Sequence, residues 1–183
     1  MLLHVPTANN MAGWRPFNLY TSVNLSWVNA ADGPTNTRQG YLSMSTATAY
    51  GSVAVDVPAV MLGPWVPYGV TDVPYVPEGQ PQPPPERHVH YLRSYRQQAP
   101  GLAFSLWLRA TTTARVDVAV ALWAISEVGG PAPSDAGVNV QLSRAWQRIE
   151  VVHGPFPPDY MARCEVYVLT ANQPIHIAGA SLH

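Results

Sequence analysis

The sequence lacks lysine altogether and holds a single cysteine, Cys164. One cysteine excludes an internal disulfide, and it also excludes a zinc site built from several cysteines. Because Cys164 falls in a run that alternates like a β-strand, we expect its thiol to be buried and unreactive.

Charge is also scarce in this chain. Only 11% of the residues are charged, the formal net charge is −1, and all ten basic residues are arginine. No basic stripe is visible along the sequence, so we expect no nucleic-acid partner.

Two kinds of long apolar segment are missing as well. The chain does not open with a charged stretch followed by an apolar run, so we expect no signal peptide and synthesis in a cytoplasm. No uninterrupted apolar run reaches the length that a bilayer requires, so we expect no membrane partner.

Apolar and aromatic residues, in contrast, are plentiful. Hydrophobic residues make up 47% of the chain, with six tryptophans and nine tyrosines. Together with the low charge, this composition predicts more apolar surface than a free monomer would expose. We therefore expect a further subunit to cover part of it, as in a homo-oligomer.

The stretch Gly101–Ala124 (GLAFSLWLRATTTARVDVAVALWA) shows the clearest pattern. Two runs alternate apolar with other residues and flank a threonine-rich break, which predicts a half-buried antiparallel hairpin. The positions predicted to face the core are Phe104, Leu106 and Leu108 in the first run, and Val116, Val118, Val120 and Leu122 in the second.

Similar short runs recur along the chain between turn signals. This spacing predicts an all-β antiparallel jelly-roll sandwich, in one domain over residues 14–183. The further strands are expected near residues 17–20, 23–28, 41–46, 52–57, 88–97, 138–142, 145–152, 163–170 and 175–180.

Two segments do not fit a sandwich strand. Residues 1–13 predict an N-terminal arm, and residues 58–87 hold nine prolines, which exclude a helix or an inner strand. The Pro-rich segment is either a surface loop or spacer, or a stiff arm that docks on a neighbouring subunit. In the second case Trp65, Tyr68 and Tyr75 would be its anchors.

Three segments resemble the carbohydrate-binding-module-like jelly rolls, the galactose-binding-like sandwiches. These are Gly101–Ala110 (GLAFSLWLRA), Leu142–Ile149 (LSRAWQRI) and Ile175–Leu182 (IHIAGASL). The resemblance implies a β-sandwich and a core position for Trp146. Many relatives place an acidic residue where Ala178 stands, often near a structural calcium; because this chain lacks that carboxylate, the resemblance does not lead us to predict a calcium site.

The aromatic residues on the outer strand faces are the candidate site. Trp107, Trp123 and Tyr167 are predicted to lie on such faces, where aromatic rings can stack against sugars, with Arg109 as a polar neighbour. Asp117 and Gln141 are further candidates. Alternatively, the Pro-rich segment or a partner chain covers these rings, since aromatic pairs also stabilise sheets and interfaces.

The sequence offers little for catalysis or for a cofactor. No serine stands in a Gly-x-Ser-x-Gly turn, and the eleven acidic residues are scattered. His88 and His90 have the spacing to reach one metal ion, but two ligands make no site. We therefore expect no enzyme, no metal and no cofactor.

A stand-alone module of this kind looks like the β-sandwich proteins that tailed bacteriophages carry on their particles. Arginine-only basicity and richness in alanine and proline suit a phage of a GC-rich host. The expectation is a virion structural protein, a minor capsid or decoration protein or a minor tail protein, that binds neighbouring virion subunits. The alternative is a glycan-binding adhesion module, which binds host polysaccharide; a fragment of a carbohydrate-active enzyme ranks last.

Overall fold

The computed structural model describes residues 13–17, 22–34, 40–58, 62, 101–126, 133–154, 156 and 160–182. The predicted N-terminal arm, apart from Gly13, lies outside these residues, as does the strand expected at 88–97. So does the Pro-rich segment apart from Pro58 and Leu62, and with it the three predicted anchors Trp65, Tyr68 and Tyr75.

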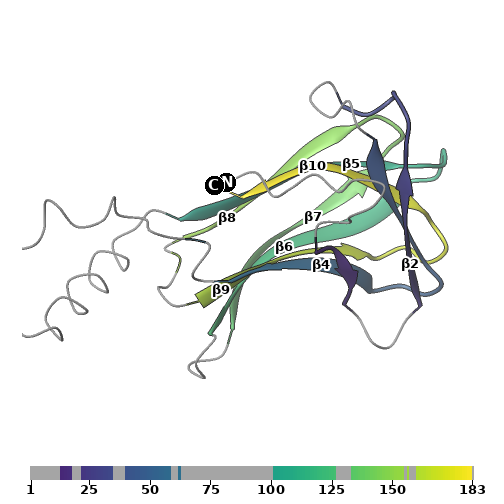
Figure 1. Cartoon of the computed structure of the whole chain (residues 1–183). Helices are drawn as coiled ribbons and strands as arrows, with labels where there is room; N and C mark the ends of the chain where they lie inside the picture. The colour runs from purple at the N-terminus through teal and green to yellow at the C-terminus, as the bar shows by residue number, and fades with distance from the viewer. Residues whose placement is uncertain are drawn as a thin grey trace, which may run out of the picture.

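The described residues form two five-stranded sheets that pack face to face (Figure 1). The β6 sheet has the order β1 (Arg15–Pro16), β4 (Gly51–Val57), β9 (Tyr160–Val168), β6 (Val116–Ser126), β7 (Ser134–Leu142). The β5 sheet has the order β2 (Val23–Val28), β3 (Tyr41–Thr46), β10 (Ile175–Leu182), β5 (Leu102–Ala110), β8 (Gln147–His153). All neighbouring strands pair antiparallel, so the predicted all-β antiparallel sandwich is confirmed.

The core lies between the two sheets and follows the predicted alternation. Phe104, Leu106 and Leu108 of β5, and Val118 and Leu122 of β6, are 0% exposed. Side chains alternate between the two faces of a strand, so the residues between these positions point outward. Burial of each such large apolar side chain contributes about 1.5–3 kcal/mol to folding.

Cys164 belongs to the same core, on the inner face of β9. Its side chain is 0% exposed, and burial raises the pKa of its thiol far above the usual range. The expectation of a buried thiol is confirmed.

The predicted hairpin over Gly101–Ala124 is wrong in its pairing. β5 pairs with β8 and β10, whereas β6 pairs with β7 and β9, so the chain crosses from one sheet to the other. The threonine-rich link is held by other segments: the backbone N–H of Thr111 donates to Pro174 O, and that of Ala110 donates to Ser143 O. These bonds occupy groups that a tight hairpin would have used for its own turn.

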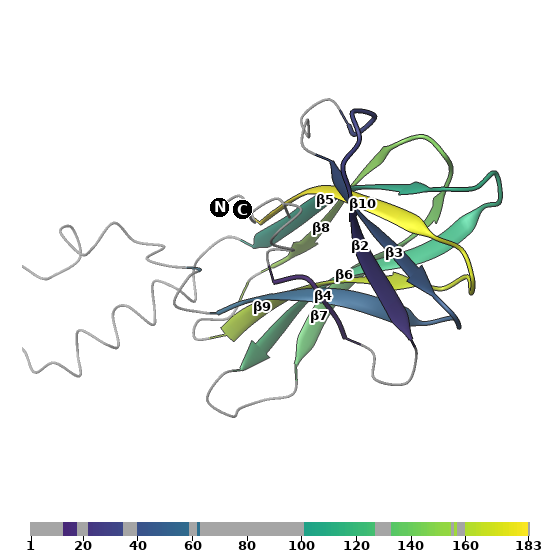
Figure 2. The same cartoon turned by 45° about the vertical axis from the view of Figure 1, so that its right-hand side comes forward.

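Within the described residues, no helix has both the length and the apolar character needed to span a bilayer. The view in Figure 2 shows the same two layers, with the ends of the strands spreading apart.

Candidate functional site

The outward face of the β6 sheet gathers two aromatic side chains around a carboxylate. Trp123 projects from β6, and Tyr167 and Glu165 project from β9, at alternate positions to the buried Val166 and Cys164. The pairing register places Glu165 opposite Ala121, in the row between those of Trp123 and Tyr167. We call these three residues, with their neighbours on the same face, the Trp123 face.

Short side chains surround Glu165 on this face. Ala54 pairs with Glu165 on one side, Ala121 pairs with it on the other, and Gly137 follows on β7. Ala119 lies beside Tyr167 in the next row. Because these side chains are short, the Trp123 and Tyr167 side chains project further from the sheet than the residues around them.

Glu165 is almost fully buried although it points outward. Its side chain is 1% exposed, and each carboxylate oxygen accepts one short hydrogen bond. Ser52 Oγ donates to Oε1 at 2.6 Å, and the Tyr167 hydroxyl donates to Oε2 at 2.6 Å. Hydrogen bonds to a carboxylate are the strong kind, and these two hold the Tyr167 ring in a fixed orientation.

Tyr167 remains a hydrogen-bond donor at all ordinary pH values. Burial raises the pKa of its hydroxyl well above the usual range, and the bond to Glu165 raises it further. The Trp123 indole N–H has no acceptor with good hydrogen-bond geometry among the described residues, yet it acts on the Tyr167 hydroxyl enough to lower this pKa slightly. The Trp123 indole N–H therefore lies near the Tyr167 hydroxyl without a well-formed hydrogen bond to it.

An arginine pair borders the Trp123 face. Arg163, which pairs with Trp123 across the strands, donates to both Asp56 oxygens at 2.7 and 3.2 Å. Arg15 donates to the same carboxylate, and both guanidinium groups lie over the Phe17 ring, at 4.1 Å for Arg163 and 5.2 Å for Arg15. Burial alone would raise the pKa of Asp56, but the bonds from Arg163 and Arg15 outweigh it and lower the pKa.

A polar group lies at the far end of the same face. Gln141 donates to Asp117 Oδ1 at 3.0 Å and accepts a bond from Arg115 at 2.9 Å. Asp117 and Gln141, both candidates from the sequence, thus lie on the Trp123 face together with Trp123 and Tyr167.

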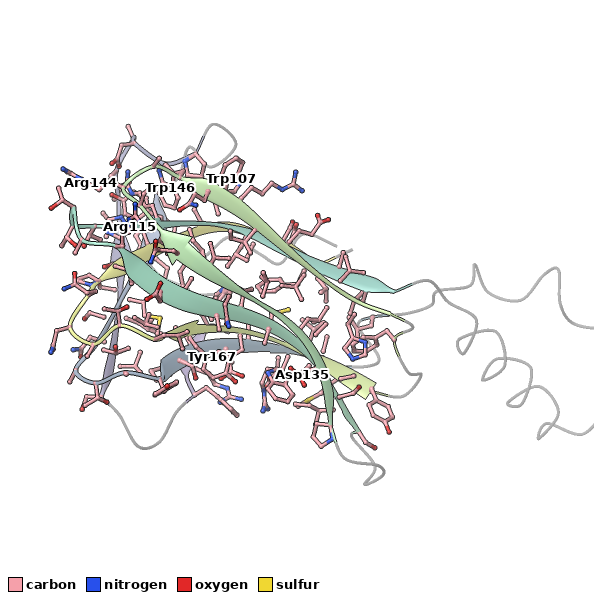
Figure 3. All side chains as sticks on the ribbon, turned by 180° about the vertical axis from the view of Figure 1, so that it is seen from behind. Trp107, Arg115, Asp135, Arg144, Trp146 and Tyr167 are labelled. Atoms are coloured by element: carbon pink, nitrogen blue, oxygen red, sulfur yellow. The ribbon has the colours of Figure 1, made fainter. Side chains whose placement is uncertain are left out.

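Trp107 and Arg109 do not belong to this face. They point outward from β5, in the other sheet, so the sandwich core separates them from Trp123 and Tyr167. Figure 3 shows Trp107 and Tyr167 on opposite sides of the sandwich. The single aromatic face predicted from the sequence is therefore two faces, because the two strands that carry the tryptophans are not neighbours.

Arg109 is fully engaged in a cluster on the β5 sheet. It donates to Asp32 at 2.6 Å, to the Tyr41 hydroxyl at 3.0 Å and to His176 Nδ1 at 3.1 Å. Its guanidinium also lies 5.0 Å from the centre of the Tyr41 ring and 4.5 Å from that of Trp146. These contacts indicate that Arg109 anchors the loop that contains Asp32.

Trp146 also differs from its predicted role. It is half-buried outside the β5 sheet, where its indole N–H donates to Asp32 O at 2.8 Å, and so it is not a core residue. Its ring packs against the Arg109 guanidinium and the Tyr41 ring.

Sequence reasoning missed Glu165, Ser52 and Arg163. The signal was present for two of them, because Arg163, Glu165 and Tyr167 alternate with Cys164 and Val166 and so share the outward side of one strand. Ser52 could not have been found in this way, since only the β4–β9 register brings it beside Tyr167.

Among the described residues, no three histidine, cysteine, aspartate or glutamate side chains gather where they could hold a metal ion. What the Trp123 face offers is two partly exposed aromatic side chains, held in place by the buried Glu165, and exposed polar side chains such as Asp117 and Gln141 at its border. Such a surface can stack against a flat, hydroxyl-bearing ring and form hydrogen bonds at its edge.

No protein-family model and no curated protein sequence matches this chain. Solved structures do match it. The CBM22-1 xylan-binding domain from Paenibacillus barcinonensis Xyn10C has a TM-score of 0.58 at 8% identity, and the match covers 100% of this chain and 94% of that domain.

Two further matches are parts of larger chains. The CBM22-1–GH10 modules of Clostridium thermocellum endo-1,4-β-D-xylanase 10B, complexed with xylohexaose, match with a TM-score of 0.58 at 10% identity, over 100% of this chain and 28% of that one. The enzymatically active domain of bacteriophage CBA120 tailspike protein 4 matches with a TM-score of 0.58 at 11% identity, over 94% of this chain and 19% of that one. At these identities the likeness shows a shared β-sandwich fold.

Proposed function

We propose that this protein is a carbohydrate-binding module that binds a polysaccharide on its Trp123 face. The observation that carries the proposal is the placing of Trp123 and Tyr167 on one outward sheet face, on either side of the hydrogen-bonded Glu165 carboxylate. Aromatic rings with a few fixed polar groups are the usual means by which proteins orient sugar rings.

The two aromatic side chains lean toward one another across this face. Their backbone positions are about 13 Å apart along the strand direction, because Tyr167 pairs with Ala119, four residues before Trp123 on β6. The Tyr167 hydroxyl nevertheless bonds Glu165, in the row between, and lies close enough to the Trp123 indole N–H to be affected by it. The two rings together would form one stacking surface for a sugar chain.

The structural neighbours support the same class of ligand. One matching domain is described as xylan-binding and another was solved with xylohexaose. We therefore propose a β-linked polysaccharide of the xylan kind as the first ligand to test.

The expectation of a virion structural protein says more than sugar binding does, and it stays a prediction. One matching structure is a bacteriophage tailspike domain, which makes a phage setting compatible with glycan binding. We propose that the protein binds sugar without catalysis. This proposal does not depend on whether a phage particle carries the protein.

Isothermal titration calorimetry with soluble xylan, mixed-linked glucan and galactan tests the proposal. We expect one of these polymers to bind, and we expect Trp123→Ala and Tyr167→Ala each to weaken binding by about tenfold or more, because hot-spot aromatic residues carry most of the energy of such contacts. Trp107→Ala is the matched control, since it removes an equally large ring from the opposite face.

Two results would count against the proposal. One is the absence of binding across the whole panel. The other is a loss of binding in Trp107→Ala that Trp123→Ala does not show. Circular dichroism of each variant confirms that a loss of binding does not arise from unfolding.

A further inference from the structure

β7 is an open edge of the sandwich. It is the last strand of the β6 sheet, and among the described strands it pairs with β6 alone. With nine residues it is longer than β1, β2 and β8, the other three edge strands. Residues 134–141 are exposed or half-exposed, and 37% of the Val138 surface is in contact with solvent.

Edge strands usually carry features that prevent pairing with another chain, such as proline, charge or short length. β1 has two residues, one of which is Pro16, and β8 carries Arg148 and Glu150. β7 has no proline and a single charged residue, Asp135. Within the described residues, β7 therefore presents an almost unprotected row of backbone donors and acceptors.

The sequence of β7, SDAGVNVQL, is complementary to itself when read antiparallel about its midpoint, Val138. On the inner face, Val138 meets its own copy and Ala136 meets Val140. On the outer face, Gly137 meets Asn139 and Asp135 meets Gln141. Apart from Ser134, which lies opposite Leu142 at the ends of the strand, apolar residues of the inner face meet apolar residues, and Asp135 meets a polar residue on the outer face.

The charges at the two ends of the strand also match. Arg115 donates to Gln141 at 2.9 Å, and therefore lies at the opposite end of β7 from Asp135, as Figure 3 shows. In the antiparallel pair, Asp135 of one copy faces Gln141 of the second copy, whose side chain is bonded to both Arg115 and Asp117 of that copy. The two-fold symmetry repeats this contact, in which Asp135 would lie near Arg115, at the other end of the pair.

We propose that β7 pairs with β7 of a second copy of this chain, about a two-fold axis that passes between the Val138 residues of the two copies and is perpendicular to the sheet. The two β6 sheets then form one sheet of ten strands. Such an axis keeps each sheet face on its own side, so the two Trp123 faces lie side by side. One long polysaccharide would then contact both copies. This consequence rests on the proposed function, whereas the dimer itself does not.

Analytical ultracentrifugation of the full chain, without sugar, tests the dimer. We expect the wild-type protein to sediment as a dimer and Val138→Lys to dissociate about tenfold more readily, because two like charges then meet at the axis. Asn24→Lys, an exposed residue of the edge strand β2, is the matched control and should leave the dimer intact. A monomeric wild-type protein, or a dimer that Val138→Lys does not weaken, overturns the proposal.

An exchange of charge between Asp135 and Arg115 tests the register independently of any structural effect of Val138→Lys. Asp135→Arg alone and Arg115→Glu alone should each weaken the dimer, and the double variant should recover it. Failure of the double variant to recover the dimer would contradict the proposed register. Calorimetry on monomeric Val138→Lys separates the two proposals: unchanged affinity for xylohexaose per chain supports the sugar site whatever the oligomeric state.

Discussion

At the scale of single residues, Arg109 and His176 show how an outward sheet face can be built for stability. Arg109 joins β5, β3, β10 and the loop around Asp32 through three hydrogen bonds. The bond from Arg109 lowers the pKa of Asp32, whereas burial, followed by Asp32, raises the pKa of the Tyr41 hydroxyl. The group is therefore internally satisfied, and we assign it no ligand.

His176 makes this cluster sensitive to acid. Burial, together with the nearby Arg109 charge, lowers its pKa from 6.5 to about 4, and the neutral ring accepts the Arg109 Nε–H. Between these two pH values the unfolded chain binds the proton more readily than the folded chain. The stabilisation is therefore complete above about pH 6.5 and is lost as the pH falls toward 4.

We expect His176→Gln to show a smaller loss of unfolding free energy over this pH range than the wild-type protein shows. Glutamine can still accept the Arg109 bond but does not titrate. Urea unfolding of both proteins across the range measures the difference, in which the titrations of the acidic residues common to both cancel. Parallel pH profiles for the two proteins would refute the role given to His176.

At the same scale, the sequence predicted the outward positions of Trp123 and Tyr167 but not the carboxylate between them. Aromatic residues at outward strand positions can be recognised from alternation alone. Glu165 looks like an ordinary solvated charge until the register places the Ser52 and Tyr167 hydroxyls against it. A contact between distant strands leaves no local signal.

At the scale of elements, alternation predicted which side of each strand faces the core but not which strand is its neighbour. The expected ranges for β2 and β3, residues 23–28 and 41–46, match the structure. β5 and β6, however, were expected to pair because they are adjacent in the sequence. In a sandwich, however, a short link can also cross from one sheet to the other. The prediction therefore placed Trp107 and Arg109 on the same face as Trp123, which is wrong.

Gly40 shows how tightly one connection is built. It has a φ of 99° just before β3, where an added Cβ would lie 2.3 Å from Val28 O and 2.8 Å from the Trp27 ring. We expect Gly40→Ala to destabilise the protein by roughly 2–4 kcal/mol, because both the backbone angle and the close approach oppose a side chain.

Gly137→Ala is the control for this prediction. Its added Cβ would meet Val120 O at 3.3 Å, and its backbone has no positive φ. Urea unfolding should show a clearly smaller loss for Gly137→Ala than for Gly40→Ala, and an equal or larger loss would contradict the strain assigned to Gly40.

At the scale of the whole molecule, the sandwich core separates two outward faces that carry different side chains. The β5 sheet face is occupied by the Arg109 cluster, and the β6 sheet face presents Trp123 and Tyr167 among shorter side chains. The composition of the sequence, rich in aromatic residues and poor in charge, predicted exposed apolar surface. Among the described residues, the exposed large apolar side chains are Val138 on β7, Val152 on β8 and Tyr50 between β3 and β4.

The measurement that tests the central claim most directly is an NMR titration of the six indole N–H signals with an oligosaccharide from the panel, beginning with xylohexaose. We predict that the Trp123 signal shifts with added sugar, together with the amide signals of Glu165 and Tyr167, while the Trp107 and Trp146 signals stay in place. Shifts confined to Trp107 or Trp146, or no shift with any oligosaccharide of the panel, would contradict a sugar site on the Trp123 face.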